Sequence, residues 1–172
     1  MQREFGTVKT TLYRPPENRP ASEKTNIRPL KQQYLIVDGY NIIFAWEELA
    51  AIAKEDLEAA RRQLMDALSD YAGFRKHRVV LVFDGYKVKG NLGEKTQYHN
   101  IQIVYTKENE TGDNYIESLV SQIGSNYNIR VATSDSLVQL SAIRTGVLRM
   151  SARELKEEIA IAKKEMQQHY RK

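Results

Sequence analysis

Short runs of consecutive apolar residues alternate along the chain with stretches in which apolar residues recur every three or four positions. The runs predict strands buried on both faces, because such a strand has no polar side to present to water. Five strands are expected, at residues 34–38, 78–84, 101–106, 129–135 and 147–150.

The stretches between these runs have helical spacing. The clearest spans residues 55–72, and it places five apolar side chains on one face: Leu57, Leu64, Met65, Leu68 and Tyr71. Further helices are expected at residues 113–124 and 136–145, and from the capping box Ser151-Ala-Arg-Glu154 towards Tyr170. Strands that alternate with helices predict βαβ units, and therefore a three-layer α/β fold with a mostly parallel sheet of about five strands.

One connection between predicted strands does not contain a helical pattern. The segment between Asp84 and Ile101 is polar, contains glycine and is longer than an ordinary connection. It is therefore interpreted as a loop, of the kind that is often functional or mobile.

Charge and proline separate a leading segment from the rest. Residues 1–33 hold seven basic and three acidic side chains and all four prolines, whereas residues 34–172 hold nineteen of each charge. We interpret residues 1–33 as a flexible extension and residues 34–172 as the folded domain. The extension is either a solvated tail or an electrostatic arm for nucleic acid.

Composition excludes several kinds of site. The chain has no cysteine, so a disulfide framework, a thiolate metal site and a cysteine nucleophile are excluded. No apolar run approaches the roughly 20 residues of a membrane span, and the N-terminus lacks the apolar stretch of a secretory signal. We expect a soluble cytoplasmic protein without a membrane partner, with a plastid or another organelle left open.

Acidic residues end the predicted strands. Asp38, Asp84 and Asp135 end the first, second and fourth strands, and Asp113 begins the helix that follows the third. In a parallel sheet these four acids converge on one edge, where α/β proteins bind ligands. Crowded carboxylates repel one another, and a divalent cation with oxygen ligands, Mg²⁺ or Mn²⁺, would neutralise them.

Two more polar side chains belong to this expected site. Glu117 lies four residues after Asp113, on the same helix face, and could bind the metal or orient water. Asn41 lies three residues after Asp38, and its amide could bind a carboxylate, a phosphate or water. Each acid also has a simpler interpretation as a helix cap, a turn former or a solvated surface group.

Five separated motifs resemble one family. They are "VDGYN", "VFDGYKVKG", "YTKENETGDNYIE", "VATSD" and "SARELKEEI", and the similarity spans residues 34–160. Together they resemble the YacP-like branch of the NYN domains, which are related to the PIN-domain ribonucleases. At Gly112, before Asp113, this family commonly has alanine.

The resemblance implies a PIN-like, Rossmann-like fold and a metal-dependent endoribonuclease. It implies an acidic set of Asp38, Asp84, Asp113 and Asp135 with Asn41 as polar partner. Mg²⁺ held by Asp38, Asp113 and Asp135 would activate water, which Asp84 or Glu117 would position or deprotonate. The products would carry a 5′-phosphate and a 3′-hydroxyl. The expected substrate is messenger RNA in the decoding site of a translating ribosome.

Basic and aromatic residues near the acids are candidates for binding RNA. The basic candidates are Lys87, Lys89, Lys95, Lys107, Arg144 and Arg149, and the aromatic ones are Tyr40, Tyr86 and Tyr98. Trp46 is instead interpreted as a packing anchor beneath the site. Two alternatives to the endoribonuclease stay open: a ribosome- or RNA-binding module with little activity, and a structure-specific DNA nuclease.

Overall fold

A six-stranded sheet forms the centre of the domain in the computed structural model, which describes residues 31–85, 92–134 and 146–170. The chain divides into two units, Met1–Lys31 and Gln32–Lys172, and every described element belongs to the second. The strand order is β5-β6-β4-β3-β7-β8. The strands are β3 (Gln32–Asp38), β4 (Arg78–Phe83), β5 (Glu94–Tyr98), β6 (Ile101–Tyr105), β7 (Tyr127–Ala132) and β8 (Val147–Met150).

The prediction of a mostly parallel sheet is confirmed. The five expected strands all pair in parallel, with β3 between β4 and β7. The expected loop between Asp84 and Ile101 is wrong in part, because it contains β5, which pairs antiparallel with β6 at the edge of the sheet. Its first four residues are exposed, so β5 buries no continuous face and leaves no hydrophobic pattern to detect.

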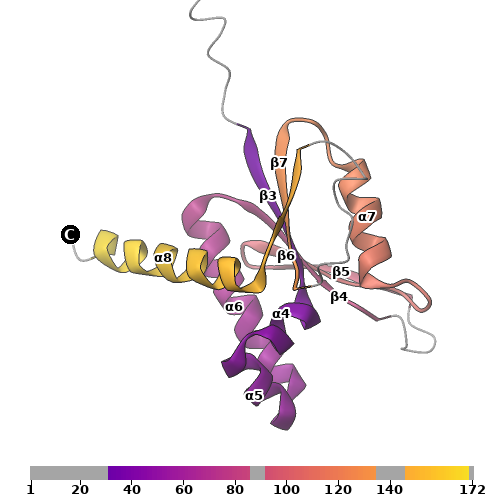
Figure 1. Ribbon diagram of the computed structural model, residues 1–172, viewed down its shortest axis with the longest axis horizontal. Coiled ribbons are helices and arrows are strands. Elements are labelled where there is room, and N and C mark those ends of the chain that lie inside the picture. Colours follow the sequence, from indigo (N-terminus) through magenta and orange to yellow (C-terminus); the bar gives the residue numbers. More distant parts are fainter. Residues whose placement is uncertain (1–30, 86–91, 135–145, 171–172) are drawn as a thin grey trace, which may run out of the picture. The chain divides into compact units, whose positions relative to one another are not determined.

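Helices cover both faces of the sheet (Figure 1). One face carries α4 (Gly39–Ala45), α5 (Glu47–Glu55), α6 (Leu57–Arg75) and α8 (Ala152–Tyr170), and the other carries α7 (Gly112–Gln122). The expected helices at 55–72, 113–124 and 151–170 are confirmed within a few residues. The pair α4 and α5 was not predicted. The expected helix at 136–145 and residues 1–30 of the extension lie outside the described residues.

None of the helices described is long and apolar enough to cross a membrane.

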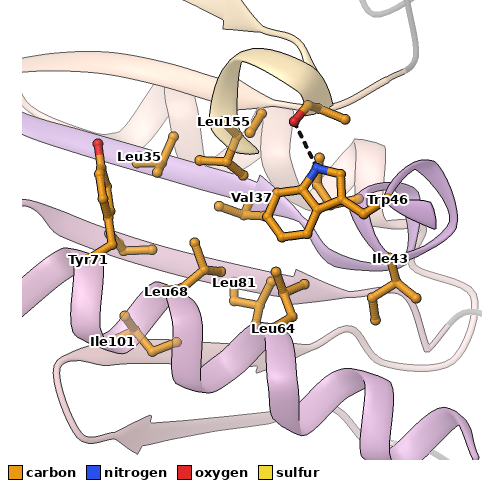
Figure 2. Packing of buried hydrophobic residues seen from close by; sticks show 14 of the residues in the cluster. Leu35, Val37, Ile43, Trp46, Leu64, Leu68, Tyr71, Leu81, Ile101 and Leu155 are labelled. Carbon is orange, nitrogen blue, oxygen red and sulfur yellow. Dashed lines mark hydrogen bonds between the residues drawn. The ribbon is translucent and has the colours of Figure 1, made fainter. Parts of the chain in front are cut away.

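Trp46 anchors the helical layer, as the sequence predicts. It lies between α4 and α5, is 8 % exposed, and its indole N–H donates to the backbone oxygen of Ala152 at 2.8 Å. Figure 2 shows the indole beside Val37 of β3, with Leu64 of α6 and Leu155 of α8 in the same cluster. This contact joins the first helix after β3 to the start of α8.

A half-buried ion pair ties α6, β7 and α8 together. Arg130 of β7 donates to Glu158 of α8 at 2.6 Å, and the Tyr71 hydroxyl of α6 donates to the same carboxylate at 2.8 Å. The His77 ring packs edge-on against Tyr71, with centroids 5.5 Å apart. Burial lowers the pKa of His77, and the Arg130 charge lowers it further.

We expect this histidine to make the domain less stable in mild acid. Because the folded-state pKa of His77 is below its ordinary value of 6.5, the unfolded chain binds the proton first as pH falls. The free energy of unfolding should therefore decline as pH drops below about 6.5. Urea unfolding between pH 7.5 and 5.0 measures this decline. The free energy of unfolding should decline less for His77→Gln than for the wild type. For the control variant His169→Gln, which replaces an exposed histidine, it should decline as much as for the wild type. Equal slopes in all three proteins would contradict the assignment.

Candidate active site at the carboxyl edge of the sheet

The sheet has a switch point beside β3. From β3 the chain moves to β4 and β6 on one side, and it then returns to β7 and β8 on the other. In open α/β sheets, ligands bind beyond the carboxyl ends of the strands at such a point. Asp38 is the last residue of β3, and Thr133 and Ser134 follow β7 directly.

Asp38 and Asn41 are linked to the end of β7 by hydrogen bonds. Thr133 is 1 % exposed, and its hydroxyl lies 3.2 Å from Asp38 Oδ2 and 3.3 Å from Asn41 Oδ1, so it can donate to either. Ser134 also donates to Asn41 Oδ1, through its backbone N–H and its hydroxyl. Because Asn41 Oδ1 accepts these bonds, the donor side of its amide is oriented away from β7.

Asp38 does not act as a helix cap. It occupies the N-cap position of α4, but its side chain makes no capping hydrogen bond to that helix within the described residues. Asn41 lies inside α4, and its oxygen accepts hydrogen bonds from residues more than ninety positions away in the chain. The fold therefore holds both side chains across the switch point.

Asp84 is tied to the start of α7. It follows β4, and its Oδ2 accepts a hydrogen bond from the backbone N–H of Gly112 at 3.1 Å. Asp113 is the next residue, in the first turn of α7. The cap of α7 is Thr111, whose hydroxyl accepts from the N–H of Asn114 at 3.0 Å. Asp113 thus follows the residue whose backbone binds Asp84, and it is not the cap of α7.

A buried threonine supports the turn that carries Asp84. The Thr106 hydroxyl accepts from the N–H of Gly85 at 2.7 Å, and the Thr106 N–H donates to Phe83 at 3.0 Å. These bonds join the ends of β4 and β6. Asp38 ends β3 and Asp84 follows β4, and because these neighbouring strands are parallel, both acids lie at one edge of the sheet.

The acids that the structure describes do not form a complete metal site by themselves. Within residues 31–85, 92–134 and 146–170, no three acidic or histidine side chains are close enough together to hold a metal ion. Glu117 is exposed on α7, and Asp135 lies outside the described residues. The chemistry of the donors, carboxylate oxygens with neighbouring hydroxyl and amide groups, fits a hard cation such as Mg²⁺.

The RNA-binding candidates are in different places. Lys95 lies near the carboxyl end of β6 by its pairing with Val104, and Lys107 follows β6. Arg149 is exposed on the edge strand β8. Tyr98 pairs with the first residue of β6, so it lies at the amino end of that strand, whereas the acids lie at the carboxyl ends of the parallel strands. Four candidates lie outside the described residues: Tyr86, Lys87, Lys89 and Arg144.

Tyr40 packs into the helical layer. It is half-buried, its ring lies 4.9 Å from that of Phe83, and its hydroxyl accepts from Arg61 at 3.0 Å. The structure therefore gives Tyr40 a packing role, and its stacking on RNA stays a prediction.

The sequence did not single out Thr133, Ser134 or Thr106 as part of the site. A signal was present: hydroxyl residues follow β6 and β7 directly, where an apolar strand ends and side-chain donors can reach neighbouring strand ends.

Two glycines next to the acids should respond oppositely to substitution by alanine. At Gly39 a Cβ would lie 2.5 Å from the Phe83 ring and 2.9 Å from the Val82 oxygen, so Gly39→Ala should destabilise by roughly 1–3 kcal/mol. At Gly112 a Cβ would lie 3.6 Å from Asp84 Cβ, an ordinary contact. Gly112→Ala should therefore stabilise by about 0.4–1 kcal/mol. Urea unfolding measures both, and a destabilised Gly112→Ala would contradict this packing.

Comparisons with known sequences and structures identify the family of this chain. The family model described as the YacP-like NYN domain matches residues 35–172. The chain belongs to the YacP-like NYN domain family. YacP of Bacillus subtilis (strain 168) is 39 % identical over 139 residues, which cover 80 % of this chain and 81 % of the relative.

Solved structures agree with this placement. The crystal structure of Rae1 (YacP) from Bacillus subtilis has a TM-score of 0.68 and 37 % identity, covering 81 % of this chain and 80 % of that one. A single-residue mutant of Rae1 has a TM-score of 0.69 and 34 % identity, covering 81 % and 82 %. The PIN-like fold of this family is thereby confirmed, and membership supports an RNase-type role.

Proposed function

We propose that this chain is a metal-dependent endoribonuclease that cleaves messenger RNA in association with the translating ribosome. The observation that carries the proposal is the placement of Asp38, Asp84 and Asp113 at one edge of the sheet. Thr133 connects Asp38 to the end of β7, and Gly112 connects Asp84 to α7. This edge holds acidic side chains where an α/β sheet binds its ligands.

A divalent ion would complete the site. Asp38 and Asp113, together with Asp135, are the proposed ligands, and Mg²⁺ or Mn²⁺ suits their carboxylate oxygens. When bound, such an ion polarises a phosphate and lowers the pKa of a coordinated water.

The protein's own side chains have separate roles. Asp84 or Glu117 positions the attacking water or accepts its proton. Asn41, with its oxygen held by Thr133 and Ser134, directs its amide hydrogens towards the substrate phosphate. Because water attacks rather than the ribose 2′-hydroxyl, the products carry a 5′-phosphate and a 3′-hydroxyl.

Charge supports a ribosome as the partner that positions the substrate. Residues 34–172 hold equal numbers of basic and acidic side chains, nineteen of each. Affinity for nucleic acid comes largely from the contacts of basic residues with phosphates. A domain without excess positive charge should bind free RNA weakly, and association with the ribosome would supply the missing affinity.

Mapping of RNA ends tests this function. Cells with and without the chain are compared by sequencing 5′-monophosphate RNA ends, with and without an inhibitor of translation. We expect ends within coding sequences that require both the chain and translation. Ends that persist when translation is blocked would contradict the ribosome's role. Identical RNA ends in both cell types would favour an RNA-binding module. Breaks in DNA that occur only in cells with the chain would favour a DNA nuclease.

Thr133 should be a positioning residue for this activity. Thr133→Val keeps the shape but removes the hydroxyl that lies between Asp38 and Asn41. We expect kcat to fall about 10- to 100-fold with a smaller change in KM, the usual cost of removing a group that orients a metal ligand. Thr133→Ser should restore most of the rate because it restores the donor. If the valine variant cleaves at the wild-type rate, this role is wrong.

A further inference from the structure

A groove of about 400 Å³ lies between α7, β5 and the loop after β6. The residues on which the inference depends are Leu92, Lys95, Lys107, Tyr115, Ser118 and Gln122, which all line it. Asp38, Asp84 and Asp113 do not belong to its lining, so it is a separate feature from the candidate active site. It nevertheless borders the same helix, α7, whose first turn carries Asp113.

Tyr115 presents an aromatic surface in this groove. Its side chain is half-buried, and the Lys95 ammonium lies 5.7 Å from the ring centroid. Ser118 and Gln122 lie one and two turns further along the same side of α7, where Gln122 donates to Ser118 Oγ at 3.1 Å. Leu92, which precedes β5 and also lines the groove, is 90 % exposed. An aromatic face, an exposed apolar side chain and polar edge groups thus occur together.

The charges of the groove are balanced. Lys95 and Lys107 line it together with Glu94 and Glu110. Such a lining does not attract polyanions strongly over a distance. It favours a ligand that stacks on an aromatic ring and makes a few local phosphate contacts. A nucleotide has both parts, since its base combines a flat apolar face with polar edges and its phosphate can meet one lysine.

We propose that this groove binds a nucleotide of single-stranded RNA, with its base stacked on Tyr115 and its phosphates near Lys95 and Lys107. The inference rests on the proposed function, because it adds a substrate-binding site beside the one for cleavage. An α-helix is about 10–12 Å across with its side chains. RNA held along α7 therefore lies within a few nucleotides of Asp113 in the first turn of the same helix.

Nuclear magnetic resonance of the ¹⁵N-labelled full chain tests the proposal without requiring cleavage. An unstructured RNA hexamer is added to about 1 mM, well above the roughly 0.1 mM at which weak non-specific binding is detectable. Amide signals of Leu92, Tyr115 and Leu119 should shift. Loss of one stacked base weakens binding about 5- to 150-fold, so Tyr115→Ala should raise Kd by that factor. Tyr115→Trp should bind at least as tightly as wild type.

Matched controls separate the groove from general effects. Lys95→Met should weaken binding and make the salt dependence shallower by about 0.7 in log–log slope, the value for one phosphate contact with a single strand. Tyr170→Ala and Lys163→Met change an exposed tyrosine and an exposed lysine on α8, and they should bind as wild type. Circular dichroism of each variant establishes that it is folded.

Failure of this inference can be told apart from failure of the proposed function. If the groove amides do not shift, or if Tyr115→Ala and Lys95→Met both bind as wild type, the groove proposal is overturned while cleavage can stand. If the groove binds RNA but the wild-type chain leaves RNA ends in cells unchanged, the nuclease proposal is overturned instead.

Discussion

Replacing Asp113 by asparagine is expected to remove RNA cleavage while leaving the domain folded. Asparagine keeps the size of the side chain but loses the negative charge that we assign to metal binding. The rate should fall at least about 100-fold, the lower range for removing a catalytic group that acts on a proton or a charge. A translation-coupled cleavage assay with purified protein measures the loss.

The effect on folding should be small by comparison. Asp113 is exposed in the first turn of α7, and the helix cap is Thr111. The negative charge of Asp113 interacts favourably with the helix dipole, so its removal should lower the stability by only about 0.3–1 kcal/mol. Asp70→Asn makes the same chemical change at an exposed position of α6 and should cleave normally. Undiminished cleavage by the Asp113 variant would rule out its assigned role.

Truncating Trp46 to alanine is expected to cause a large loss of stability. The indole is 8 % exposed and packs in the cluster formed by α4, α5, α6 and α8. Removing so large a buried side chain typically costs about 3–5 kcal/mol. The lost bond to the Ala152 oxygen adds about 1 kcal/mol. Domains of this size are stable by about 5–15 kcal/mol, so a substantial fraction would be lost.

Urea denaturation followed by circular dichroism measures this loss, and Phe44 supplies the matched control. Phe44 is an aromatic residue of α4, two positions before Trp46, but its side chain is 61 % exposed. Phe44→Ala should therefore change stability by only about 0.5 kcal/mol. Trp46→Phe should be intermediate, because it retains most of the packing and loses the hydrogen bond. A loss below about 1 kcal/mol for Trp46→Ala would contradict the anchoring role.

Much of the fold was predictable because burial leaves a local pattern. The runs at 34–37 and 79–83 are apolar throughout, since helices cover both faces of the central strands, and they form most of β3 and β4. The spacing of Leu64, Leu68 and Tyr71 follows from the single buried face of α6. Parallel strands then place their terminal acids at one edge, so the positions of Asp38 and Asp84 also follow from the sequence.

Other features were decided by contacts between distant residues. The strand β5 lies at the sheet edge and is held by backbone pairing with β6, so its side chains carry no burial pattern. Lys95 and Tyr115 come from separate elements, and their contact exists only once β5 has paired. The groove beside α7 could not have been foreseen from spacing alone.

The sequence by itself determined which segments are buried and which residues end the parallel strands, and therefore the edge of the sheet where the acids lie. The tertiary structure decided their partners: Thr133 with Asp38 and Asn41, and Gly112 with Asp84. The physical reason is that the burial of a strand or of one helix face is recorded in the pattern of apolar residues that are neighbours in the chain. A hydrogen bond between side chains ninety residues apart depends on strand register and helix placement, which no local pattern records.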